Sequence, residues 1–152
     1  MLQETMQISL KKLELIKRYA REAYPYECCG VLVGIVERHY DLSTENIILE
    51  VAPCENIYQG DKRTGFEISA FDMYDIALTA QRAGLQVLGT YHSHTQTSAI
   101  PSAMDFDFLP PEHSLMILAV TGRVVYEIRS FSRTRQSLGF DDIFEEQVRL
   151  RF

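Results

Sequence analysis

The chain has 152 residues, of which 46% are hydrophobic and 24% charged, and this composition predicts one folded domain over residues 1–152. The net charge of -6 and the lack of a basic stripe argue against nucleic acid as a partner. No apolar run is long enough for a membrane span, and the N-terminus lacks the apolar segment of a secretion signal. We therefore expect a cytoplasmic protein with neither a membrane nor a nucleic acid as its partner.

The first predicted element is a helix over residues 10–23, which Ser9 can cap and Pro25 stops. Its apolar residues recur at helical spacing, while basic residues fill the other faces. Two runs rich in valine and isoleucine follow, on either side of a polar turn at 37–46, and predict two antiparallel strands. Residues 57–65 are polar and contain glycine, so they predict a loop.

A short strand and a second helix are predicted next. Residues 66–69, with the sequence FEIS, predict the strand. Ser69 and Asp72 resemble a capping box, in which a serine and an acidic residue satisfy backbone groups at a helix start. The helix should run to about Ala83 and end at Gly84.

The second half of the chain is rich in predicted strands. Residues 85–94 predict a strand with apolar side chains on both faces, and 114–122 and 124–132 predict two more. The tail at 140–152 is amphipathic and fits either a strand or a helix. Together the elements predict an α+β fold: a mixed, mostly antiparallel curved sheet flanked by helices in a sandwich-like arrangement.

The strand at 85–94 ends in a histidine pair. Side chains two residues apart on a strand share a face, so His92 and His94 present two imidazoles side by side. A catalytic zinc site commonly has three protein ligands and a water, and Asp105 is the obvious third ligand. Two simpler interpretations remain open. In the first, the histidines are only two polar residues at a sheet edge. In the second, Ser102 and Asp105 form a capping box, although a carboxylate in a first helical turn can also face a metal.

These residues have the spacing of a known motif. His92, His94, Ser102 and Asp105 reproduce H-x-H-x(7)-S-x(2)-D, which resembles the JAMM motif of the MPN+ zinc metalloproteases. The upstream glutamate of that motif corresponds to Glu27 in the stretch YPYECCGVLVG. The chain is thus similar to the small prokaryotic members of the family, and the resemblance implies an MPN/JAB-like fold with layers like those of cytidine deaminases.

The resemblance covers most of the chain. It extends from the first helix to about Phe131 and includes Asn56, which follows the second predicted strand, and the FEIS segment. One departure is Thr95, since many members have proline after the second histidine. This difference leaves the ligand set intact and puts only the rigidity of the following loop in doubt.

The resemblance implies a site and a mechanism. His92, His94 and Asp105 would hold one Zn²⁺ per chain, with a bound water as the fourth ligand. Glu27 would accept a proton from that water and deliver it to the leaving amine. Ser102 would donate a hydrogen bond to the developing oxyanion, and the amide would be hydrolysed without a covalent intermediate.

Other reactive side chains are better explained by structure than by catalysis. Cys28, Cys29 and Cys54 form no even framework and are expected to be reduced, mostly buried thiols. A catalytic thiol is disfavoured because no Cys-His family signature surrounds them. His39 and His113 lie in predicted loops and should be surface residues. Phe106 and Phe108 are expected to pack in the core rather than to flank a substrate groove.

The resemblance also implies a substrate class. Small members of the family act on ubiquitin-like or sulfur-carrier proteins that end in Gly-Gly, and the short loops here leave no room for the insertions of larger relatives. We therefore expect an isopeptidase or peptidase that hydrolyses the amide bond after such a tail. Two alternatives stay open: a non-catalytic scaffold of the MPN type, and a zinc amidase that acts on a small peptide or cysteine conjugate. The sequence also leaves homodimer formation open.

Overall fold

The computed structural model describes residues 4–107, 109–133 and 143–152. The strands are β1 (Thr5–Ser9), β2 (Cys29–Arg38), β3 (Thr44–Cys54), β4 (Gln86–His94), β5 (Ser114–Thr121), β6 (Val124–Arg133) and β7 (Ile143–Arg151). The helices are α1 (Leu10–Ala23), α2 (Ala70–Arg82) and α3 (Ala103–Asp107). The prediction for Phe108 and the part of the predicted tail at 140–142 lie outside the described residues. Among the helices of this described part, none is both long and apolar enough to cross a membrane.

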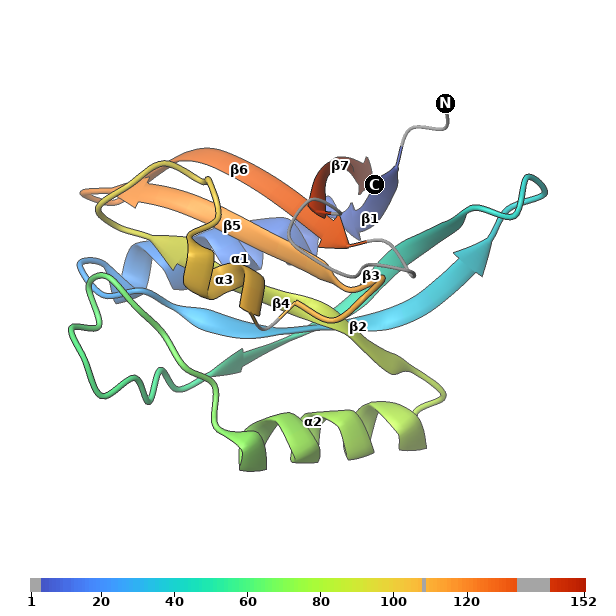
Figure 1. Ribbon diagram of the computed structural model, residues 1–152, viewed down its shortest axis with the longest axis horizontal. Coiled ribbons are helices and arrows are strands. Elements are labelled where there is room, and N and C mark those ends of the chain that lie inside the picture. Colours follow the sequence, from blue (N-terminus) through green and yellow to red (C-terminus); the bar gives the residue numbers. More distant parts are fainter. Residues whose placement is uncertain (1–3, 108, 134–142) are drawn as a thin grey trace.

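The strands close into a barrel in the order β1-β3-β2-β4-β5-β6-β7, with β7 pairing back onto β1. The predicted α+β fold, a sandwich-like arrangement of a mixed, curved sheet flanked by helices, is therefore wrong. The missing piece is β1, which was not predicted and which pairs in parallel with both β3 and β7. Ile8 of β1 lies opposite Ile48 on one side and Leu150 on the other. Figure 1 shows the result, with β1 beside β7.

Most of the predicted elements form. Ser9 caps α1 by accepting the N–H of Lys12 at 3.1 Å, and Ser69 caps α2 in the same way. β2 and β3 form the predicted antiparallel pair, and the described part of the tail is strand β7. The strand predicted at 66–69 is wrong, because this segment forms no ladder and leads directly to the cap of α2.

The core lies on both faces of the sheet. Inside the barrel, Leu13 and Ile16 of α1 join the largest buried cluster together with side chains from β1, β2, β3, β4 and β5. Outside, α2 covers β2 and β4, where Val31 and Val33 pack against Ala80. A separate patch on the outer face of β5 is covered by the segment on either side of α3, through Ala99 and Leu109. Figure 1 shows α2 and α3 lying outside the barrel strands.

Gly89 fixes the course of β4 between its two neighbours. The register between β2 and β4 shifts beside this residue, and the parallel pairing with β5 begins at Gly89 opposite Ser114. Its φ angle is +154°, and an added Cβ would lie 1.9 Å from the backbone oxygen of Ser114. Only glycine allows β5 to approach β4 this closely.

We expect Gly89→Ala to lower the free energy of unfolding by roughly 3 kcal/mol, because both the backbone angle and the packing against β5 are lost. Chemical denaturation measures this change. Gly84→Ala is the matched control, since Gly84 also has a positive φ of +77° but nothing lies within 4 Å of an added Cβ. The control should cost only about 1 kcal/mol. Equal losses in the two variants would contradict this account of β4.

Candidate metal centre

The two histidines lie on one face at the end of β4, as predicted. Tyr91 points into the barrel core, and the hydroxyl oxygen of Ser93 accepts the N–H of Cys28 at 2.8 Å. The alternation along the strand therefore places His92 and His94 together on the outer face, at the edge of the area that α2 covers. β4 is paired with β2 on one side and β5 on the other, and both imidazoles are buried, so the simpler interpretation of two polar residues at a sheet edge is wrong.

The capping box at α3 forms as well. Ser102 N–H donates to Oδ2 of Asp105 at 2.8 Å, and Asp105 N–H donates to Oγ of Ser102 at 3.3 Å. These reciprocal bonds fix the first turn of α3 and hold the Asp105 carboxylate toward β4. The cap and the metal-ligand interpretations are thus compatible, since one carboxylate can serve both.

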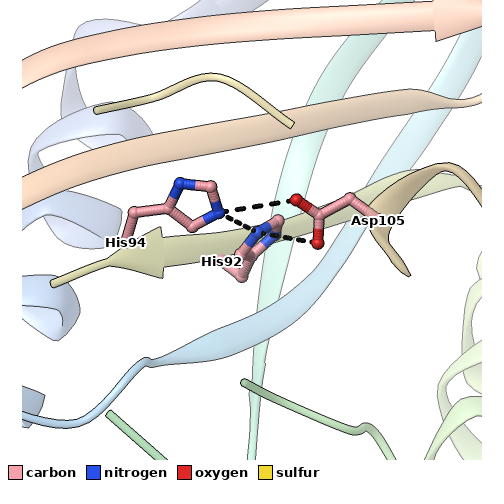
Figure 2. Close-up of side chains that lie close together, drawn as sticks. All are labelled: His92, His94 and Asp105. Atoms are coloured by element: carbon pink, nitrogen blue, oxygen red, sulfur yellow. Dashed lines mark hydrogen bonds and ion pairs between the residues drawn. The ribbon is translucent and has the colours of Figure 1, made fainter. Parts of the chain in front are cut away.

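His92, His94 and Asp105 converge on one point, as Figure 2 shows. The two Nε2 atoms are 3.1 Å apart, Nε2 of His92 is 3.3 Å from Oδ1 of Asp105, and Nε2 of His94 is 3.4 Å from Oδ2. Four ligands around a tetrahedral zinc, each about 2.0–2.1 Å from the ion, are separated by about 3.3 Å. The two nitrogen atoms therefore have about the spacing of two corners of such a tetrahedron, and Asp105 presents one carboxylate oxygen to each of them, with the ligand atoms of all three residues within 4.8 Å of one another.

The hydrogen-bond acceptors in the cluster outnumber the donors, which favours the binding of a cation. Nδ1 of His94 donates to the backbone oxygen of Ser98 at 2.7 Å, which leaves the lone pair of Nε2 facing the cluster in the neutral ring. Nε2 of His94 and both oxygens of Asp105 are then acceptors, and His92 can place at most one hydrogen among them. A metal ion would satisfy all of these lone pairs at once.

The charges in the cluster depend on one another. Burial would raise the pKa of Asp105, but hydrogen bonds with His92 and His94 lower it well below its usual value. Burial lowers the pKa of His92, whereas for His94 the bonds to Asp105 and to Ser98 outweigh burial and raise the pKa. Asp105 is thus ionised and His92 stays neutral. A carboxylate and a neutral imidazole are the forms in which these side chains bind a metal.

Phe66 is a site residue that the sequence analysis missed. Its ring stacks on the His92 imidazole with the centroids 4.2 Å apart and an angle of 22° between the planes. The contact fixes the orientation of a ring whose Nδ1 is buried and has no hydrogen-bond partner among the described residues. Phe66 belongs to the segment that was expected to be a strand, and no local pattern in the sequence points to the stacking.

The two predicted catalytic residues line the cavity beside this cluster. The cavity has a volume of about 460 Å³, and its walls include Glu27, His94, Ser102 and Asp105. Glu27 is only 7% exposed. Burial raises the pKa of its carboxyl to about 8, with His94 opposing the rise and Asp105 adding to it. A carboxyl group tuned in this way can both take up and release a proton near neutral pH.

The thiols do not form a second reactive centre. Burial raises the pKa of Cys28 to about 11, that of Cys29 to about 12 and that of Cys54 to about 11, so all three stay protonated at neutral pH. All three are free, as predicted. His39 contacts Glu45, and His113 is half-buried rather than exposed; the cluster includes neither of them.

The comparison with known families gives the same answer as the motif. A family described as prokaryotic homologs of the JAB domain matches residues 11–134. The chain belongs to this family. The resemblance to small prokaryotic JAMM/MPN proteins is therefore confirmed.

Three individual proteins that resemble this chain are between 24% and 28% identical to it in sequence. A desampylase of Haloferax volcanii is 28% identical over 101 residues, which cover 66% of this chain and 67% of that protein. A solution structure of a protein from Desulfitobacterium hafniense is 27% identical, covers 97% of this chain and 93% of its own, and superposes with a TM-score of 0.72. A solution structure from Salinibacter ruber, 24% identical over 97% of this chain and 91% of its own, shares the fold with a TM-score of 0.67.

The geometry predicts that the chain binds one divalent metal ion and that His94→Ala loses it. Elemental mass spectrometry should find about one metal per wild-type chain and little in the variant. After chelation, added metal should raise the melting temperature of the wild type only, because a ligand stabilises the state that binds it. His39→Ala, which removes an imidazole outside the cluster, should keep the metal. Full metal occupancy in His94→Ala would contradict the assignment.

Proposed function

We propose that the chain is a zinc-dependent isopeptidase or peptidase. It hydrolyses the amide bond that follows the C-terminal Gly-Gly of a ubiquitin-like or sulfur-carrier protein. The observation that carries the proposal is the convergence of His92, His94 and Asp105 beside a cavity that Glu27 and Ser102 also line. A non-catalytic scaffold would have no need of this complete set.

Each residue has a role in this proposal. His92, His94 and Asp105 hold the zinc, which when bound would polarise the scissile carbonyl and lower the pKa of a water molecule. Glu27 accepts a proton from the attacking water and delivers it to the nitrogen of the leaving amine. Ser102 Oγ already accepts the N–H of Asp105, so its own hydrogen can be donated to the oxygen on which negative charge develops.

The substrate class rests on the relatives and on the shape of the cavity. The Haloferax volcanii relative is named a desampylase, and we extend to this chain an isopeptidase activity toward a ubiquitin-like modifier. The lining of the cavity includes Thr64 and Gly65 from the segment before α2, and Thr97 and Ser98 from the segment after β4. Glycine residues in a substrate tail let the backbone pass between such walls and approach the cluster closely.

A substrate panel tests the proposal. A ubiquitin-like protein ending in Gly-Gly is linked to a lysine side chain, extended by one residue, or supplied in both forms with the diglycine changed to Ala-Ala. Intact-mass analysis should show cleavage after the second glycine and little cleavage of the Ala-Ala forms. Efficient hydrolysis of a small glycine amide but not of the proteins would favour the amidase alternative. No hydrolysis by fully metal-loaded protein would favour the scaffold.

Glu27→Gln should abolish nearly all hydrolysis while the fold and the metal remain. The amide is similar in shape to the carboxyl group but cannot accept the proton, so the loss should be at least about 10²-fold in kcat. Initial rates, metal content and melting temperature check this. Glu22→Gln, on the exposed face of α1, makes the same chemical change away from the cavity and should leave kcat unchanged. Retained activity in Glu27→Gln would remove this residue as the base.

Ser102→Ala should lower kcat by roughly 10²- to 10³-fold with the metal still bound, as for the loss of one oxyanion donor. The same change removes the cap of α3, which should cost about 1 kcal/mol of stability. Ser69→Ala removes an equivalent cap from α2 and controls for this loss. If the two variants lose similar stability and keep similar kcat, Ser102 acts only as a cap.

A further inference from the structure

Glu27 lies two residues beyond the end of a strand ladder. β2 and β3 pair with Cys29 opposite Cys54, and this is the last pair at this end of the barrel. Two residues further along each strand, Glu27 comes opposite Asn56. No β3 backbone group is paired with Glu27 in the ladder, and the side chain of Asn56 takes that position instead. Its Nδ2 donates to the backbone oxygen of Glu27 at 3.1 Å.

Asn56 uses its whole amide to build this corner. The second Nδ2 hydrogen goes to the backbone oxygen of Gly65 at 3.0 Å. The Oδ1 atom accepts two backbone N–H groups, those of Tyr58 and Glu67, each at 3.1 Å. An asparagine amide has two hydrogens to donate and two lone pairs to share, and here all four are engaged. Such complete use is typical of a residue that fixes a backbone shape.

The loop at 57–65 also holds the backbone N–H of Glu27. The N–H of Glu27 donates to the backbone oxygen of Lys62 at 2.8 Å. The neighbouring carbonyl, that of Arg63, accepts the hydroxyl of Thr95 at 2.7 Å, and Thr95 directly follows His94. Both backbone groups of Glu27 are therefore bonded within the corner that Asn56 closes, and the loop is itself tied to the end of β4.

We propose that Asn56 is a positioning residue for Glu27: it holds the backbone of the general base in register with the metal cluster across the cavity. This inference rests on the proposed function. Because Glu27 precedes β2, its place depends on the bonds to Asn56 and Lys62 rather than on a strand ladder. A displacement of about 1 Å in a catalytic group can cost about 10²-fold in rate, so these bonds have consequences for kcat.

Asn56→Asp is the main test. The aspartate keeps the size of the side chain and can still accept the two N–H groups, but it cannot donate to Glu27 or Gly65. We expect kcat to fall about ten- to a hundredfold, with KM changed less than about threefold and the metal retained. A rise in KM at unchanged kcat would mean that Asn56 only shapes the cavity wall, and would overturn the proposal.

Asn46→Asp is the matched control. Asn46 is a buried amide near the first residues of β3, where its Nδ2 donates to the backbone oxygen of Glu112 and to Ser114 Oγ. Its loss should lower the melting temperature by an amount similar to that for Asn56→Asp and leave kcat unchanged. If both variants lose kcat in proportion to stability, the effect of Asn56 is merely structural.

Thr95→Val is a milder variant in case Asn56→Asp does not fold. It keeps the shape of the side chain and removes only the bond to Arg63, so kcat should fall a few-fold with the metal still bound. An unchanged kcat in Thr95→Val beside an unfolded Asn56→Asp would count against the proposal, because the tie between the loop and β4 would then have no effect on the site.

Amide hydrogen exchange on the metal-free protein gives a measurement that needs no activity. The amide of Glu27 should exchange about tenfold faster in Asn56→Asp than in the wild type, and at the wild-type rate in Asn46→Asp, whereas the amides of Tyr58 and Glu67 keep their acceptor in both variants. If exchange accelerates but the wild type cleaves no substrate, the corner is real and the proposed function fails. If the wild type is active while exchange and kcat are unchanged in Asn56→Asp, the positioning role fails.

Discussion

The Asp105 carboxylate, buried between two buried imidazoles, sets the demands that the surrounding structure must meet. A buried carboxylate is costly unless several groups share its charge, and here Ser102 N–H and two Nε2 atoms surround it. The contact joins the end of β4 to the first turn of α3 across a loop. Every element that fixes either partner therefore contributes to the site, because a shift of either one would move the ligand atoms apart.

In the barrel, β4 lies between β2 and β5, and different segments cover the outer faces of these two neighbours. Its inner face is filled by α1 and the barrel core, while α2 covers the outside of β2 and β4. The segment that carries α3 instead packs on the outside of β5, through Ala99 and Leu109. The histidines lie where these two outer coverings meet, so they are buried and yet border a cavity. The inward apolar residues stabilise the fold, and the outward residues of the same strand are available for chemistry.

The clustering of His92, His94 and Asp105 was predictable from the sequence because the orientation of each residue is set locally. The shared face of His92 and His94 follows from strand periodicity, and the carboxylate of Asp105 is held by a capping box within α3. Closure of the barrel depends on contacts between distant segments, with β1 lying between β3 and β7. The five residues of β1 contain no sequence pattern that predicts pairing with two parallel strands. Phe66 escaped prediction for the same reason, since its importance comes from the ring of His92.

Thr95 shows how a departure from the family pattern is accommodated. A proline at this position would stiffen the chain after the second histidine through its ring. Thr95 is instead buried, and its hydroxyl bonds to the carbonyl of Arg63, which lies next to the carbonyl that holds the Glu27 N–H. The chain thus replaces local stiffness with a tertiary hydrogen bond. A proline has no hydroxyl group and could not make this bond. Because of it, the end of β4 and the backbone of Glu27 are bonded to adjacent carbonyl groups of one loop. The loop therefore fixes the position of Glu27 relative to the histidines.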